Sequence, residues 1–90
     1  MSLDKLPGSE LVADGLADLA ARRESVAALL VSIGAPRLRL LGWEIPCTID
    51  QAEERLYARL AAEFGDGAHS RYNALIRRLV SFQRAAACAK

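Results

Sequence analysis

Residues 25–34, SVAALLVSIG, are the stretch that most constrains the fold of this 90-residue chain. The apolar residues that recur at the spacing of one helix face are Val26, Leu29, Leu30 and Ile33. The other side is almost free of polar groups because it carries Ala27, Ala28 and Val31. A helix that is apolar on all sides is a buried helix. So few residues remain to cover it that the other helices must wrap around it, or a second copy of the chain must help.

The composition favours helices over strands. Ala and Leu account for much of the 52% of residues that are hydrophobic, whereas β-branched and aromatic residues are few. A chain of this length holds one modest core, so we expect a single helical domain over residues 1–90. The predicted fold is all-α, a compact bundle of four to five short helices.

The first expected helix runs from an N-cap at Ser9 to about Arg22. Its inner face is expected to carry Val12, Leu16 and Leu19. Gly15 is unusual there, because glycine costs about 1 kcal/mol relative to alanine inside a helix. It marks either close packing against another helix, which we favour, or simple tolerance.

The central apolar helix, residues 25–34, is expected to begin at a Ser25 cap and to end at Gly34. Glycine adopts the left-handed conformation at a helix end with little strain. Pro36 then suits the first position of a short third helix, residues 36–41, although the alternation of Arg and Leu there also fits a short strand.

A capping box predicts the start of a fourth helix. Asp50 with Glu53 has the required spacing, and Thr48 with Gln51 fits nearly as well. Gly65 is expected to end this helix. Its inner stripe is predicted to be Leu56, Tyr57, Leu60 and Phe64.

The long C-terminal amphipathic helix, residues 68–87, offers the best candidate for a binding surface. Its apolar half contains Tyr72, Leu75, Ile76, Leu79, Val80 and Phe82. We expect a partner protein or a second copy of the chain to contact Tyr72, Leu79, Val80 and Phe82. The alternative is that these side chains belong to the ordinary core.

Arginines supply the alternative function, nucleic-acid binding. Arg71, Arg77, Arg78 and Arg84 form two stripes on the last helix and are candidate phosphate contacts. The net charge of the chain is only +1, so it lacks the strong basic field that is typical of nucleic-acid-binding proteins. Pairing of these arginines with acidic residues is the competing expectation.

No arrangement of residues predicts catalysis, a cofactor or a metal site. Cys47 and Cys88 are far apart and have no Cys-x-x-Cys spacing. His69 lies beside Asp66 and Ser70, but neighbours at a helix start do not converge on one point. We therefore expect a non-catalytic protein that acts through protein-protein interaction, such as formation of a homodimer.

The sequence also bears on location and source. It shows neither a signal-like opening nor a run approaching the roughly 18 apolar residues of a membrane span, so we expect a cytoplasmic protein without membrane contact. Abundant Ala and Arg beside only two Lys residues suggest a GC-rich bacterial source.

Overall fold

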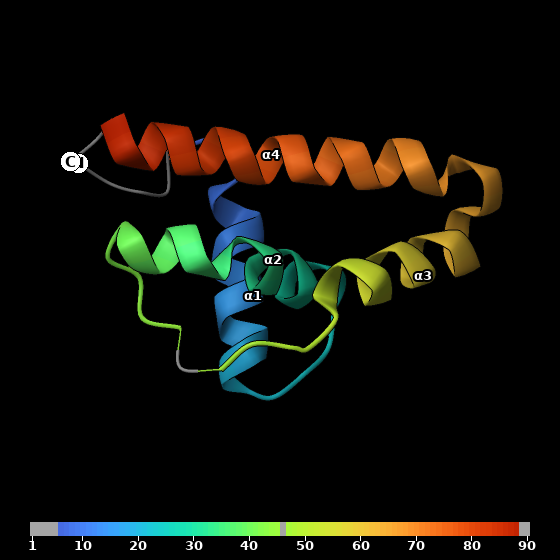
Figure 1. The fold of residues 1–90 in the computed structure, drawn as a ribbon, viewed down its shortest axis with the longest axis horizontal. Coiled ribbons are helices and arrows are strands. Elements are labelled where there is room, and N and C mark those ends of the chain that lie inside the picture. Colours follow the sequence, from blue (N-terminus) through green and yellow to red (C-terminus); the bar gives the residue numbers. More distant parts are fainter. Residues whose placement is uncertain (1–5, 46, 89–90) are drawn as a thin grey trace.

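Four α-helices and one 3₁₀ turn make up the described part of this computed structural model, which comprises residues 6–45 and 47–88. The helices are α1 (Ser9–Ala20), α2 (Val26–Leu40), α3 (Ala52–Phe64) and α4 (Ala68–Cys88), and the 3₁₀ turn (Gly65–Gly67) joins the last two. These ranges contain no strand, which confirms the all-α class. In Figure 1, α4 runs the length of the molecule, with α2 and α3 beneath it and α1 crossing at a steep angle.

None of the helices in the described ranges combines the length and the apolar character that crossing a bilayer requires.

The central helix is longer than predicted. Ser25 caps it as expected, because its hydroxyl accepts a hydrogen bond of 3.0 Å from the backbone N–H three residues later. The helix then continues through Gly34 and Pro36 to Leu40. The predicted end at Gly34 and the separate helix over residues 36–41 are therefore wrong.

Gly34 serves helix packing instead of helix termination. A Cβ atom at this position would lie 2.9 Å from the Leu79 methyl groups and 2.9 Å from the Gln83 amide nitrogen, so the missing side chain lets α4 approach α2. The buried Gln83 amide donates a hydrogen bond of 3.2 Å to the Gly34 carbonyl. A contact with a helix distant in sequence thus outweighs the local preference of glycine for helix ends.

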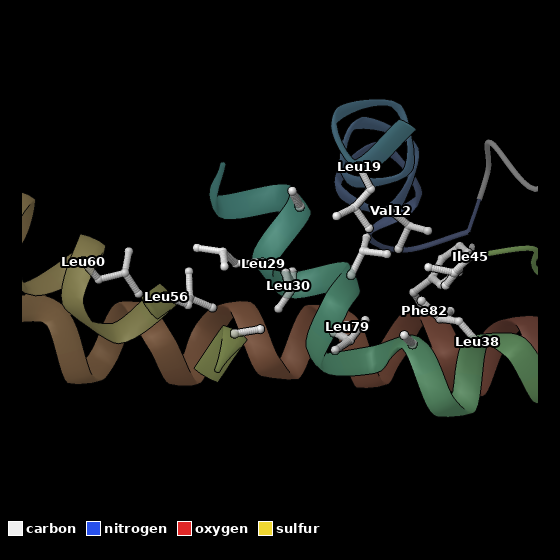
Figure 2. Packing of buried hydrophobic residues seen from close by; sticks show 14 of the residues in the cluster. Val12, Leu19, Leu29, Leu30, Leu38, Ile45, Leu56, Leu60, Leu79 and Phe82 are labelled. Carbon is white, nitrogen blue, oxygen red and sulfur yellow. The ribbon is translucent and has the colours of Figure 1, made fainter. Parts of the chain in front are cut away.

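α2 bends in its middle, as Figure 2 shows. Pro36 has no N–H to bond the carbonyl of Ser32 one turn earlier. The Ser32 hydroxyl donates to the Ala28 carbonyl (2.9 Å), a contact that also tends to bend helices. The same hydroxyl accepts from the Ile49 N–H at 3.1 Å, so the connection to α3 is attached at the bend.

The core forms around α2, as the apolar stretch predicts. Leu29, Leu30 and Leu38 are essentially inaccessible to solvent. Figure 2 shows side chains of the other elements converging on them, and the buried ones include Val12, Leu19, Ile45, Leu56, Leu60, Leu79 and Phe82. Trp43 covers one end of this core as a partly buried lid, with its ring 5.4 Å from that of Phe82.

Gly15 lies where α1 crosses α2. A Cβ atom there would lie 2.9 Å from the Ala27 carbonyl carbon, and still closer to the Ala27 carbonyl oxygen and to a Val31 methyl group. Close packing, the favoured interpretation of this glycine, is confirmed.

Both ends of α1 and the start of α3 differ from their predictions. Gly8 (φ 77°) is the N-cap of α1 in place of Ser9, and the helix ends at Ala20, with Arg22 in the left-handed conformation (φ 59°). Gln51 (φ 56°) precedes α3 with no side-chain cap. Both predicted capping boxes, Asp50 with Glu53 and Thr48 with Gln51, are therefore wrong. Gly65 (φ 57°) ends α3 as predicted.

Candidate interaction surface

A groove of about 320 Å³ lies between α3 and α4, close to the turn that joins them. Its apolar lining comes from three helices and consists of Val26, Leu60, Phe64, Ala74 and Leu75. Leu60 is buried, whereas the Phe64 side chain is at the surface and 37% exposed. The groove is therefore an open apolar surface that continues from the buried core to the outside of the protein.

Three charged residues complete the lining: Glu63 on α3, and Arg71 and Arg78 on α4. The Arg78 guanidinium pairs with Glu10 of α1 at 2.7 Å. The Arg71 guanidinium lies over the Phe64 ring, 4.4 Å from its centre, a geometry that favours a cation–π contact. Neither Glu63 nor Arg71 forms an ion pair with any residue in the described ranges.

The four residues predicted to contact a partner occupy two environments. Leu79 and Phe82 are only 4% and 2% exposed, inside the chain's own core. Tyr72 and Val80 are partly exposed, and the Tyr72 ring packs 5.7 Å from that of Tyr57. Partial burial raises the pKa of the Tyr72 hydroxyl, and the Glu53 carboxylate adds to the shift. A role for these residues in binding a partner stays a prediction.

The four candidate phosphate contacts are divided between two flanks of α4. Arg71 and Arg78 lie along the groove and are engaged by Phe64 and Glu10. Arg77 and Arg84 are exposed on the other flank, seven residues apart, and pair with no acid in the described part of the chain. The arginines thus do not gather into one patch.

The thiol and imidazole side chains lie apart from the groove lining. Cys47 is exposed beside a second hollow of about 340 Å³ at the end of α1, with its sulfur 3.9 Å from the Leu19 carbonyl. His69 contacts Asn73, one turn along α4, at 3.2 Å. Within residues 6–45 and 47–88, no three His, Cys, Asp or Glu side chains come together in a way that could hold a metal ion.

No protein-family model, curated protein or solved structure matches this chain.

The sequence did not predict the groove as a site, although it did predict the amphipathic helices that form it. Leu60, Phe64 and Leu75 fall on predicted inner faces, and a helical wheel does not show that α1 and α2 leave this end of the α3–α4 pair partly uncovered. One local signal was present. Ala74 lies between Arg71 and Arg78 on one flank of α4, so a small residue separates two cations at positions i, i+3 and i+7.

Proposed function

We propose that this protein is non-catalytic and acts by binding a helical segment of a protein in the groove between α3 and α4. The observation that carries the proposal is the open apolar lining of this groove with opposite charges on its walls. Amphipathic helices are recognised in this way, since their apolar face enters a groove and their charged flanks meet its rim.

The lining residues suit such contacts. Leu75 is partly buried and Phe64 is exposed, and both offer apolar surface to the groove. Apolar surface rimmed by charge is typical of interaction sites on small soluble proteins. Arg71 is held over the Phe64 ring, so one cation is already positioned before a partner binds.

The fluorescent dye anilinonaphthalene sulfonate tests whether the groove binds apolar groups, because its naphthalene ring suits the lining and its sulfonate suits Arg71. The variant is Ala74→Glu, which adds a charged side chain at an exposed groove position and removes none of the core. The matched control is Ala61→Glu, at an exposed position of α3 that does not line the groove.

We expect dilute native protein to enhance the dye fluorescence. Ala74→Glu should abolish this enhancement, and Ala61→Glu should leave it unchanged, with the helical circular dichroism equal in all three proteins. Absence of enhancement, or enhancement that Ala74→Glu does not reduce, would contradict the proposal. Leu40 is 83% exposed at the end of α2 and is another apolar position where the dye could bind. If only a Leu40→Glu variant lost the fluorescence enhancement, the dye would bind at Leu40 and not in the groove.

Nucleic-acid binding is the second candidate, and it is favoured by Arg77 and Arg84, which are exposed and form no ion pair within residues 6–45 and 47–88. Exposed arginines along one flank of a helix can contact a phosphate backbone. Fluorescence anisotropy with labelled DNA and RNA should then show binding that weakens by orders of magnitude between about 50 and 200 mM salt. No binding at low salt, or equal binding by a double Arg77→Glu and Arg84→Glu variant, would rule this candidate out.

A further inference from the structure

The α3–α4 groove carries an anion and a cation that nothing in the described chain neutralises. Glu63 is on the α3 wall and Arg71 is on the α4 wall. Both side chains are exposed, and they line the same groove without forming an ion pair with each other. A ligand that fills the groove therefore meets one charge of each sign on opposite walls.

A second copy of the chain matches this charge pattern by symmetry. In a twofold dimer the same patch faces itself, so Glu63 of one copy meets Arg71 of the other, and the reverse contact follows automatically. A purely acidic segment would leave Glu63 next to like charge, and a purely basic segment would do the same to Arg71. The groove is self-complementary in charge.

The position of the groove in the fold favours the same partner. Figure 1 shows the turn between α3 and α4 at one end of the molecule, beyond α1. Val26 at the start of α2 is the only residue outside α3 and α4 among those that line the groove in the described chain. Two such helix pairs packed together would form a four-helix arrangement and would bury the Phe64 and Leu75 surface of both copies.

From these observations we infer that the groove between α3 and α4 binds a second copy of this chain, in a twofold dimer held by reciprocal Glu63–Arg71 contacts. The inference rests on the proposed function and names the partner of the same groove. A chain of 90 residues buries a smaller share of its surface on folding than a larger domain does, so burial of further apolar surface in a dimer also adds stability.

Sedimentation equilibrium on the full chain tests the inference. The wild type should sediment as a dimer that dissociates on dilution. Glu63→Arg and Arg71→Glu should each create two like-charge contacts across the twofold axis, so the dissociation constant of each variant should rise roughly tenfold or more. The controls are Glu54→Arg and Arg77→Glu, which make the same charge changes at exposed positions outside the groove and should not alter the constant.

Mixing the two groove variants gives the decisive result. In a heterodimer of Glu63→Arg with Arg71→Glu, both contacts again join opposite charges, so an equimolar mixture should recover dimers although each variant alone does not. Because Glu63 has no partner within the described chain, its variant tests the contact without loss of an internal ion pair.

A wild type that stays monomeric at every concentration, or a mixture that stays as dissociated as its components, would overturn the inference. Dye binding separates the two proposals. A monomer whose groove still binds the dye retains the proposed function and takes a partner other than itself. A monomer whose groove binds no dye removes both proposals.

Discussion

Replacing Gly15 by alanine tests the account of the α1–α2 crossing. The added methyl group would overlap a side-chain methyl of Val31, and it would also overlap the backbone carbonyl of Ala27. A side chain can change its rotamer, but the backbone in the middle of a helix cannot move without its neighbours. α1 would therefore have to move away from α2, which would loosen the packing of Val12 and Leu19.

Two opposing effects set the change in the free energy of unfolding that Gly15→Ala causes. Overpacking a core costs about 1–3 kcal/mol, and overlap with backbone places this site near 3. Alanine inside a helix is more favourable than glycine by about 1 kcal/mol, which offsets part of the loss. The expected net loss is thus about 2 kcal/mol. At about 4–8 °C per kcal/mol for a domain of this size, the midpoint of thermal unfolding should fall by roughly 8–16 °C.

Thermal and urea unfolding followed by circular dichroism would measure the change. Gly34→Ala is the matched control, because the three atoms nearest to the new methyl group are the ends of the Leu79 and Gln83 side chains, at 2.9 Å. Its overlap can be relieved by small rotations, and alanine adds helix propensity, so the net change should lie within about 1 kcal/mol of zero. If Gly15→Ala were as stable as the wild type, the close crossing of α1 and α2 would be refuted.

Two further predictions concern the junction between α1 and α2. Arg22→Gly should raise stability by about 1 kcal/mol, because Arg22 is left-handed there (φ 59°) and glycine adopts this conformation without strain; a lower unfolding midpoint would contradict this. Ser25→Ala should cost about 1 kcal/mol at neutral pH through loss of the helix cap. The Ser25 hydroxyl also donates a hydrogen bond to Asp18, and this bond is the main cause that lowers the pKa of Asp18, with Arg23 lowering it further. The stabilisation from this bond, unlike that from the cap, is present above the ordinary aspartate pKa of 3.8 and is lost as the pH falls through the lowered value. The stability difference between wild type and Ser25→Ala should therefore shrink in acid unfolding curves below about pH 4, and a constant difference would show that Asp18 is not coupled to Ser25.

Features that depend on neighbouring residues were predictable from the sequence. The Ser25 cap, the end of α3 at Gly65 and the C-terminal helix, predicted over residues 68–87 and observed as Ala68–Cys88, each follow from local preferences. The predicted role of Gly34 is wrong because its packing against α4 involves Leu79 and Gln83, 45 and 49 positions away, and no local pattern contains these contacts.

The candidate site likewise combines features that local sequence predicts with features that only the tertiary structure determines. Leu75 and Leu79 are both apolar residues on the inner half of α4, yet Leu79 is buried and Leu75 lines the open groove. Their burial differs because the neighbouring helices cover Leu79 more completely than Leu75, and this coverage is a property of the tertiary structure. The sequence could identify the helix that carries the surface, but not the part of it that remains uncovered.

The bend in α2 has a consequence for how the protein opens locally. Pro36 interrupts the ladder of backbone hydrogen bonds, so the turns before and after it are not locked together by a continuous series. The first part of α2 lies in the core, whereas in its last turn only Leu38 is buried and Arg37, Arg39 and Leu40 are exposed. Amide hydrogens in this last turn should exchange with solvent through small openings, while those near Leu30 should exchange only when the whole domain unfolds. One helix in the ribbon drawing would then behave as two cooperative units.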